Sequence, residues 1–430
     1  MPAARFVPPP AAQPLRLAYL VSRYPAVSHT FILREVTALR RLGATVAVAS
    51  VNPPDRRNEQ MTAEEREEAS STYYIKQAGP VAALGAALHC LLRHPRGCLR
   101  ALRQSLTLGR GLQRLFALFY LVEAMMVLRW MERAELRHLH VHFATAGATV
   151  GMLVRALAPV GLSLTVHGPD EFDDVSAQHL RAKVQTADLV VCISQFARSQ
   201  LMRLSPAGSW RKLHVCHLGV PAELPPAPAL TTHDSAMPQL LCVGRLAPAK
   251  GQHLLLAACA VLQARGYHFQ LTLIGEGEDG PDLRAHAYRM GLGGTVLFAG
   301  ARNQIEVREA MRRADAFVLP SLAEGIPVVL MEAMASGMPC VSTPVNGIPE
   351  LIRDGEDGLL APPGDAAALA DCIARLLDDP VLCNRLAMSG RRRVREAFDL
   401  DRNVSALAAL FSGLPTALGT PRAPALKEAA

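Results

Sequence analysis

Two patterns of apolar residues alternate along most of the 430-residue chain. Short apolar runs bounded by turn residues predict strands buried on both faces, and apolar residues spaced three or four positions apart predict amphipathic helices. The runs predict strands over residues 15–21, 45–51, 139–143, 162–166, 188–193, 213–217, 239–243, 270–274, 295–298, 316–319 and 339–342. The helical spacing predicts helices over residues 30–42, 195–204, 304–313, 327–336, 366–377, 381–395 and 404–410, and one that begins at Ala146. Such alternation is typical of α/β domains with mostly parallel sheets.

The length of the chain predicts two domains, because single hydrophobic cores rarely grow beyond about 250–300 residues. A proline-rich stretch without periodicity, residues 220–238, is interpreted as the linker between them. We therefore predict an N-terminal domain over 15–219 and a C-terminal domain over 239–395. Residues 1–14, which lack the apolar run of a signal peptide, and residues 414–430 are predicted to be disordered tails.

Two glutamates in the C-terminal half carry the strongest candidate chemistry. Glu324 and Glu332 are eight positions apart, close to two helical turns, so both side chains can face one site. Pro327 suits the first helical position, and Gly337 suits the end of that helix. A helix that begins there directs free N–H groups at a phosphate or a sugar hydroxyl, and the candidate donors are Gly325, Ile326 and Val328. Because any doubly wound domain has a strand, loop and helix in this order, Glu332 could also be a solvated helix residue.

Other candidate residues follow other predicted strands. Arg245 and Lys250 follow the strand over 239–243, and two cations beside a helix N-terminus suit a diphosphate. In the N-terminal half, the loop after the first strand offers Ser28 or Thr30 as helix caps. His167 begins the sequence His-Gly-Pro-Asp-Glu-Phe after the strand over 162–166, a position at which it could simply cap its loop.

The segment from Glu324 to Glu332 resembles the Glu-x7-Glu motif of retaining nucleotide-sugar glycosyltransferases. Together with Val-Gly-Arg-Leu at 243–246, Lys-Gly at 250–251 and Gly-Ile-Pro-Glu-Leu at 347–351, it identifies the chain as a member of glycosyltransferase family 4. The branch that makes exopolysaccharide or colanic acid is the most similar. In that branch the first loop usually reads Ser-Glu-Thr-Phe, whereas His29 stands here in place of the glutamate.

This resemblance implies a type B glycosyltransferase fold, in which two Rossmann-like domains face each other across a cleft. It implies retaining transfer from a UDP- or GDP-sugar to an acceptor hydroxyl, on a lipid-linked or growing exopolysaccharide glycan. Arg245 and Lys250 would hold the diphosphate, Glu324 the sugar hydroxyls and Glu332 the ribose, while His167 would lie beside the donor sugar. The acceptor side would include Asp170 together with Ser28, His29 and Thr30, and residues 396–413 would form a helix that crosses back onto the first domain.

Two other functions fit the same motifs. A sugar-nucleotide epimerase or hydrolase on this fold would bind a similar donor but would need no acceptor. A non-catalytic nucleotide-sugar-binding protein would keep Arg245 and Lys250 but would lack an acceptor cleft. Retention of both Glu324 and Glu332 argues against loss of activity.

The positive charge of the chain lies mainly in one segment. Residues 76–137 contain ten Lys or Arg and three Glu, an excess of seven that equals the net charge of the whole chain. An apolar face at helical spacing lies in the same segment and is made of Leu112, Leu115, Phe116, Phe119, Val122 and Met126. This pattern predicts either a core helix with solvated arginines or a region that binds an anionic membrane surface. No run is long enough to cross a bilayer.

Three further patterns limit the chemistry. Gly275 to Gly280 matches the dinucleotide fingerprint, but its three acidic residues would repel a pyrophosphate, so no NAD is expected. His138, His140 and His142 share one face of a strand but do not complete a tetrahedral metal site, and we expect neither a metal nor a cofactor. Nine singly spaced cysteines indicate a reducing cytoplasm. We expect a cytoplasmic protein, at most peripheral on the inner membrane, without a nucleic-acid partner.

Overall fold

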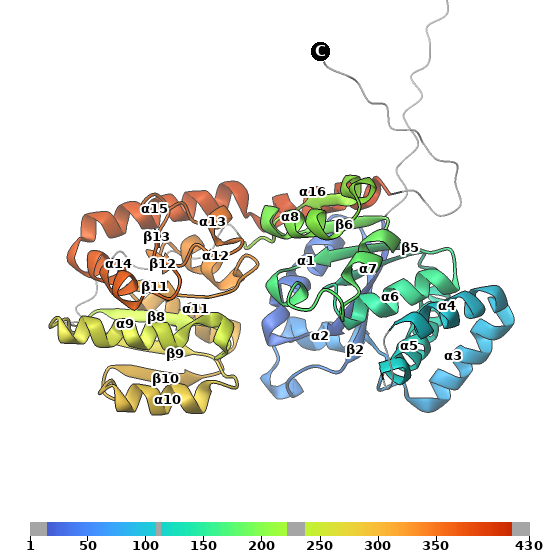
Figure 1. Cartoon of the computed structure of the whole chain (residues 1–430), viewed down its shortest axis with the longest axis horizontal. Helices are drawn as coiled ribbons and strands as arrows, with labels where there is room; N and C mark the ends of the chain where they lie inside the picture. The colour runs from blue at the N-terminus through green and yellow to red at the C-terminus, as the bar shows by residue number, and fades with distance from the viewer. Residues whose placement is uncertain (1–14, 109–112, 222–236, 415–430) are drawn as a thin grey trace, which may run out of the picture.

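The computed structural model describes residues 15–108, 113–221 and 237–414. The described chain forms two α/β domains, each built on one parallel sheet, which confirms the predicted fold class (Figure 1). Apart from Leu414, the predicted tails lie outside the described residues, as does most of the predicted linker.

The sheet of the N-terminal domain has seven parallel strands in the order β3-β2-β1-β4-β5-β6-β7. The strands are β1 (Arg16–Arg23), β2 (Thr45–Asn52), β3 (Tyr73–Tyr74), β4 (His138–His142), β5 (Gly161–Val166), β6 (Leu189–Cys192) and β7 (Leu213–Val215). The helices are α1 (Thr30–Arg41), α2 (Ala63–Ser71), α3 (Gly79–Arg93), α4 (Pro95–Thr107), α5 (Gln113–Arg133), α6 (Ala146–Leu157), α7 (Leu180–Thr186) and α8 (Gln195–Leu204). Strand order reverses between β1 and β4, and open α/β sheets bind ligands outside the carboxyl ends of their strands at such a reversal.

The C-terminal domain repeats this plan with six parallel strands in the order β10-β9-β8-β11-β12-β13. They are β8 (Gln239–Val243), β9 (Gln270–Ile274), β10 (Val296–Gly300), β11 (Ala316–Leu319), β12 (Cys340–Ser342) and β13 (Leu359–Leu360). The helices are α9 (Gln252–Ala264), α10 (Gly280–Arg289), α11 (Gln304–Arg313), α12 (Val328–Ala335), α13 (Ile348–Leu351), α14 (Ala366–Asp378) and α15 (Pro380–Ala397). Here the order reverses between β8 and β11, the two strands that lead to Arg245 and to Glu324.

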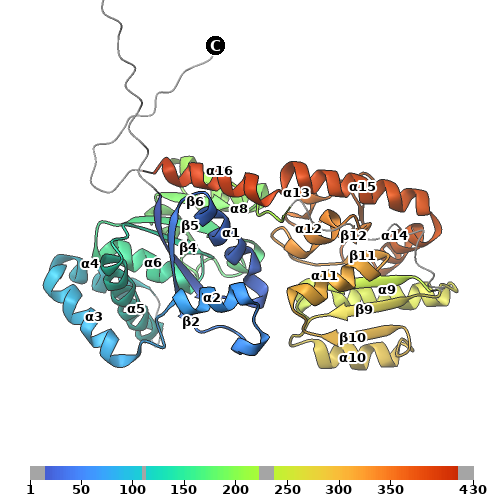
Figure 2. The ribbon, with the colours of Figure 1, turned by 180° about the vertical axis from the view of Figure 1, so that it is seen from behind.

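The last helix, α16 (Leu400–Ser412), returns to the N-terminal domain and lies along α1 (Figure 2). Val404, Leu407 and Phe411 complete a buried apolar cluster with Tyr19 and Ile32. The return is fixed where the chain crosses between the domains, because Val220 N–H donates to Phe398 O at 2.9 Å and Leu400 N–H donates to Val220 O at 3.0 Å. The N-terminal core is therefore completed by the end of the chain.

The basic segment folds into α3, α4 and α5, at the end of the N-terminal domain that faces away from the other domain (Figure 1). Met126 is buried, but Phe116 and Phe119 are 62% and 66% exposed, and Val122 is exposed as well. The interpretation of this apolar face as the buried side of a core helix is therefore wrong for Phe116, Phe119 and Val122. Helix α5 packs against its neighbours through its opposite face. Leu112 and the side chain of Leu115 lie outside the described residues.

Candidate functional site

Glu324 lies in the loop that follows β11, next to the point where strand order reverses. Glu324 is buried, with 7% of its surface exposed. Lys250 Nζ lies 2.5 Å from Glu324 Oε1, and Ser321 Oγ donates a hydrogen bond to the same oxygen at 2.8 Å. A buried carboxylate requires such partners to remain ionised. The motif glutamate is therefore held by a cation and a hydroxyl from the two loops that flank the reversal.

The loop after β8 brings two cations to the same edge of the sheet. Gly251 is the N-cap residue just before α9, with φ of +66°, and a Cβ added there would lie 2.1 Å from the carbonyl oxygen of Pro320. Only glycine allows this close approach, which brings the turn that ends at Lys250 into contact with the loop that carries Glu324. The side chain of Arg245 is exposed and makes no ion pair with any residue that the structure describes, so its charge is available to an anion.

Glu332 lies on α12 and is 4% exposed. Arg34 Nη2, on α1 of the other domain, lies 2.5 Å from Glu332 Oε1, and Gln304 Nε2 donates to the same oxygen at 2.8 Å. Both motif glutamates are thus buried and paired with cations, and Glu332 is not a solvated helix residue. Sequence reasoning missed Arg34, because an arginine in an amphipathic helix gives no signal that it contacts another domain.

The loop between Glu324 and α12 touches the N-terminal domain directly. A Cβ on Gly325 would lie 2.0 Å from His167 O, and a Cβ on Gly168 would lie 2.9 Å from Gly325 Cα. Glycine is therefore required on both sides of this contact. Ile326 is buried and Val328 begins α12, so the predicted N–H donors lie at the junction of the two domains, beside His167.

His167 follows β5 and is 8% exposed. Its ring contacts the rings of Phe31 and Phe143, with ring centroids 5.0 and 4.3 Å away, and its Nε2 lies 3.0 Å from His142 Nδ1. Burial, followed by the neighbouring His142 and His29, lowers the pKa of His167 well below its usual value. His167 is therefore neutral at physiological pH.

Glu171 fixes the backbone around His167. Its carboxylate accepts hydrogen bonds from the N–H groups of Ala144 and His167, and from that of Gly168 at 2.8 Å. Burial raises the pKa of Glu171 to about 7 although these three donors favour the charged form. Asp170, the residue proposed for the acceptor side, is exposed, and the buried group of this turn is its neighbour Glu171.

The first loop differs from the sequence prediction in how its helix begins. A short 3₁₀ turn over Val27–His29 leads into α1, and neither Ser28 nor Thr30 caps the helix with its side chain. The prediction that Ser28 or Thr30 caps the helix is therefore wrong. Because the 3₁₀ turn precedes α1, the unpaired N–H groups lie at the start of this turn, where Val27 N donates to Asp55 Oδ2 at 2.9 Å. The His29 ring lies 4.9 Å from the Phe143 ring, and burial lowers the pKa of His29.

Two of the three alternating histidines, His138 and His140, form hydrogen bonds with hydroxyl groups of β5. Ser163 Oγ lies 2.7 Å from His138 Nε2 and 2.8 Å from His140 Nδ1, and Thr165 Oγ1 lies 3.0 Å from His140 Nε2. Ligand-type atoms of Glu35, His140 and His142 lie within 4.8 Å of one another. Because both ring nitrogens of His140 already have partners, these residues do not fit a preformed metal site.

The glycines of the Gly275–Gly280 sequence have a packing role. A Cβ on Gly275 would lie 1.9 Å from Gly244 O, and a Cβ on Gly277 would lie 2.2 Å from Leu246 O. The two glycines thus let this loop pack against the one that carries Arg245. The fingerprint match has a structural explanation that requires no dinucleotide.

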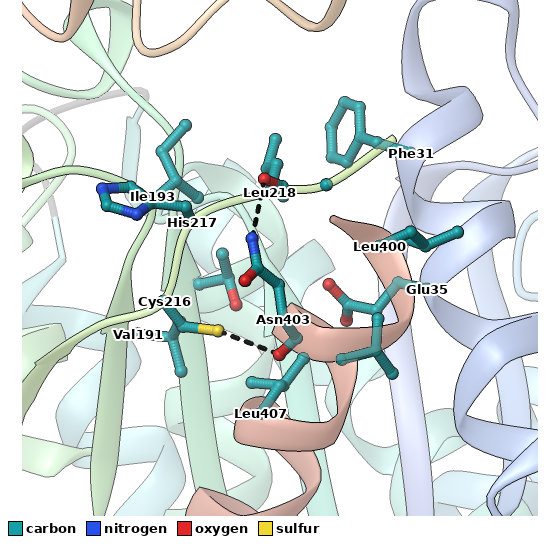
Figure 3. A pocket seen from close by; sticks show the side chains of 13 residues that line it. Phe31, Glu35, Val191, Ile193, Cys216, His217, Leu218, Leu400, Asn403 and Leu407 are labelled. Carbon is teal, nitrogen blue, oxygen red and sulfur yellow. Dashed lines mark hydrogen bonds between the residues drawn. The ribbon is translucent and has the colours of Figure 1, made fainter. Parts of the chain in front are cut away.

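Two cavities lie outside the cluster of predicted donor residues. The smaller, with a volume of about 20 Å³, lies between α1, β6, β7 and α16, and Figure 3 shows Glu35, Cys216 and Asn403 around it. This volume suffices for about one water molecule. The larger, of about 500 Å³, lies between α11 and strands β8, β9 and β10 and is lined by none of the predicted site residues.

The architecture and site together define a class of protein. Two parallel-sheet domains meet through the loops at the carboxyl ends of their strands, as in the type B glycosyltransferases. The fold is similar to sucrose-phosphate synthase from Thermosynechococcus elongatus, with a TM-score of 0.72 and 22% identity over 92% of this chain and 98% of that one. It is also similar to Anabaena HepE in complex with UDP-glucose, with a TM-score of 0.70 and 18% identity over 93% and 100% of the two chains.

Family models for glycosyltransferase family 4 and for glycosyl transferases group 1 match residues 28–224 and 230–393. The chain is 31% identical over 408 residues to the amylovoran biosynthesis glycosyltransferase AmsK of Erwinia amylovora. The matched region covers 90% of this chain and 96% of AmsK. The chain therefore belongs to glycosyltransferase family 4.

Proposed function

We propose that this glycosyltransferase moves a hexosyl group from a UDP- or GDP-sugar to an acceptor hydroxyl, with retention of anomeric configuration, during exopolysaccharide assembly. The observation that carries the proposal is the convergence of Lys250, Glu324 and His167 where the two domains meet. The similarity to AmsK supports exopolysaccharide as the product, and the complex of HepE with UDP-glucose supports a sugar nucleotide as the donor.

In this mechanism Arg245, Lys250 and the N–H groups at the start of α12 stabilise the leaving diphosphate electrostatically. Glu324 positions the sugar hydroxyls, and Glu332 binds the ribose after its ion pair with Arg34 opens. No side chain is assigned as a nucleophile, and the leaving phosphate takes the proton of the acceptor. Two cations and a helix terminus supply the charge stabilisation, so a divalent metal is not required.

The test incubates the protein with radiolabelled UDP- and GDP-sugars and a lipid extract, with EDTA present. We expect transfer of label to the lipid fraction with one donor, and a retained anomeric centre by NMR. Label released only as free sugar or as an isomerised nucleotide would instead support the hydrolase or epimerase. A strict requirement for Mg²⁺ or Mn²⁺ would contradict the metal-free mechanism.

Glu324→Gln and His167→Ala should each lower turnover by at least about 100-fold, because both groups act at the reacting sugar. The thermal unfolding midpoint should change much less than the turnover. Glu356→Gln, which alters an exposed glutamate of the C-terminal domain, is the matched control for Glu324→Gln and should keep wild-type turnover. A wild-type rate in either site variant would remove that residue from the mechanism.

We also propose that α3, α4 and α5 bind the cytoplasmic face of an anionic membrane, where a lipid-linked acceptor would be met. Twelve large apolar residues are exposed on these helices: Val81, Leu84, Leu88, Leu91, Leu92, Leu99, Leu102, Leu106, Phe116, Leu118, Phe119 and Val122. Monomeric proteins rarely expose so many apolar side chains on adjacent helices. Among the described residues, no helix combines the length and apolar composition needed to cross a bilayer.

The charges on α4 favour an anionic partner. Arg96, Arg100 and Arg103 are exposed on this helix, whereas Gly97 and Ala101 pack inward. A Cβ on Gly97 would lie 1.8 Å from Leu157 O, so α4 lies close against α6 and cannot turn its arginines inward. Basic residues near an anionic bilayer contribute about 1 kcal/mol each, and salt screens this attraction.

We expect the protein to co-sediment with anionic vesicles at low salt, to be released at high salt and not to sediment with neutral vesicles. Charge reversal at Arg96, Arg100 and Arg103 should weaken sedimentation without changing donor hydrolysis. Reversal of three exposed arginines of the C-terminal domain is the matched control: Arg289, Arg392 and Arg395. Equal sedimentation of both triple variants, or none with any vesicle, would refute the membrane proposal.

A further inference from the structure

A chain of buried polar side chains runs from the core of the N-terminal domain to His167. Glu35, on α1, is 6% exposed and accepts a hydrogen bond from Tyr19 Oη at 2.7 Å through its Oε1. His142 Nε2 lies 3.2 Å from the same oxygen. His142 Nδ1 in turn lies 3.0 Å from His167 Nε2. The order of contacts is Tyr19, Glu35, His142 and His167.

The charge of Glu35 determines where the protons of this chain lie. Burying a carboxylate is unfavourable unless a cation or hydrogen-bond donors face it. Among the described residues, no lysine or arginine lies within ion-pair distance of Glu35, and its contacts are Tyr19 and His142. Glu35 also borders the small cavity, whose volume admits about one water as a further donor (Figure 3).

His142 Nε2 is buried, has no hydrogen-bond partner among the described residues, and lies 3.2 Å from Glu35 Oε1 without the alignment of a hydrogen bond. Because a lone pair on Nε2 would face an ionised Glu35 at this distance, the carboxylate favours the tautomer of His142 with its proton on Nε2. In the neutral imidazole, Nδ1 of His142 is then an acceptor. His167 must therefore carry its proton on Nε2, which leaves its Nδ1 as an acceptor. The neighbouring rings of Phe31 and Phe143 offer no competing hydrogen bond to the His167 ring.

We propose that Glu35 and His142 are positioning residues that fix the orientation of His167 and its Nε2–H tautomer. His167 Nδ1 is thereby kept ready to accept a hydrogen bond from a hydroxyl of the sugar donor or the acceptor. This inference rests on the proposed function, in which His167 contacts substrate. Glu35 and His142 act through His167 and do not touch substrate.

A spectroscopic test reads the tautomer directly. Two-bond ¹H–¹⁵N correlation spectra of histidine-labelled protein, with His167 assigned from His167→Gln, should show protonated Nε2 and unprotonated Nδ1 in the wild type. Glu35→Gln should change this pattern for His167, because a neutral amide no longer dictates which nitrogen of His142 carries the proton. Protonated Nδ1 of His167 in the wild type, or an unchanged pattern in Glu35→Gln, would overturn the proposal.

Kinetic measurements distinguish a role of Glu35 in positioning His167 from a role of Glu35 in the stability of the fold. Glu35→Gln should lower kcat at least about tenfold with donor KM changed less than threefold, because orientation of His167 matters in the transition state. Glu68→Gln is the matched control: Glu68 is also buried and accepts a hydrogen bond from Tyr24 Oη at 2.9 Å, but it pairs with Arg40 and contacts no histidine. Glu68→Gln can lower the stability of the fold, but it should change neither kcat nor the tautomer pattern of His167 in the spectra.

Two further outcomes are distinguishable. If His167→Ala keeps wild-type turnover, the catalytic role of His167 fails, while the spectra still decide whether Glu35 sets its tautomer. Elemental analysis tests for an ion between Glu35 and His142. One equivalent of transition metal, lost in Glu35→Gln but kept in Glu68→Gln, would show that a metal and not a proton joins them, and would overturn the proposal.

Discussion

At the scale of single residues, the site is organised by how its charges pair. Lys250 and Glu324 neutralise each other at 2.5 Å, and Arg34 neutralises Glu332 at the same distance. Arg245, in contrast, is exposed and makes no ion pair with the described residues. A diphosphate would therefore find one free cation, Arg245, and one cation shared with the carboxylate that is proposed to bind the sugar.

Arg245→Ala and Lys250→Ala should each weaken binding of a nucleoside diphosphate by roughly 10- to 100-fold, the equivalent of about 1.5–3 kcal/mol for a charge-assisted hydrogen bond. Only Lys250→Ala should also lower the unfolding midpoint, because it leaves the buried carboxylate of Glu324 without its cation. Calorimetric titration and thermal unfolding measure the two effects, with Arg289→Ala as an exposed control. Unchanged affinity in both site variants contradicts the diphosphate assignment.

At the scale of elements, α13 holds the N-terminus of α8 across the domain boundary. The Glu350 carboxylate accepts hydrogen bonds from the N–H groups of Gln195 and Phe196 at 2.8 and 2.9 Å, and His217 Nε2 lies 3.1 Å away. Burial raises the pKa of Glu350, but the hydrogen bonds from His217 and the two N–H groups outweigh it and hold the pKa below its usual 4.5. A carboxylate at this end of a helix also interacts favourably with the helix dipole.

Because the pKa of Glu350 is lower in the folded than in the unfolded protein, its contribution to stability is present above about pH 4.5 and is lost as the pH falls through the folded value. Glu350→Ala should therefore lower the free energy of unfolding by about 1 kcal/mol at pH 7, and by less below pH 4. Denaturant titrations at both pH values measure this difference, and Glu356→Ala, on the exposed surface of the same domain, is the control. An equal loss at both pH values would show that the charge does not contribute.

At the scale of the whole molecule, the N-terminal domain buries neutral histidines at its centre. Burial is the largest cause that lowers the pKa of His138 to about 4 and the pKa values of His140 and His167 well below 6.5. The unfolded chain would bind protons at these residues near pH 6.5, whereas the folded protein excludes them. The N-terminal domain should therefore be most stable at a pH above the usual pKa range of histidine.

Since the unfolded state binds more protons below pH 6.5, stability should fall as the pH is lowered from about 6.5 to 4. Each buried histidine contributes up to about 1.4 kcal/mol per pH unit in this interval. Urea unfolding at pH 7.5, 6.5 and 5.5 measures the slope, which should become smaller in His140→Gln. A free energy of unfolding that stays constant from pH 7.5 to 5.5 would falsify this account of the buried histidines.

Much of the fold follows from local sequence. Strands β8, β9 and β11 and helices α8 and α11 have the predicted bounds, because their apolar residues alternate or recur within one continuous segment. The helical-turn argument for the Glu324–Glu332 spacing does not apply, because α12 begins at Val328 and Glu324 lies in the loop before it. That both carboxylates serve one site stays a prediction. The two-residue edge strands β3 and β13 were not predicted, since two residues are too few for any periodicity.

The contacts between distant segments were decided only by the tertiary structure. Arg34 meets Glu332 across 298 positions of sequence, and Gln195 meets Glu350 across 155. His142 and His167 are joined because neighbouring strands place their ends together. A local pattern fixes which face of an element is apolar, because that depends on residues within two or three turns. Which polar side chains meet depends on how complete elements pack, and no single segment of the sequence carries that information.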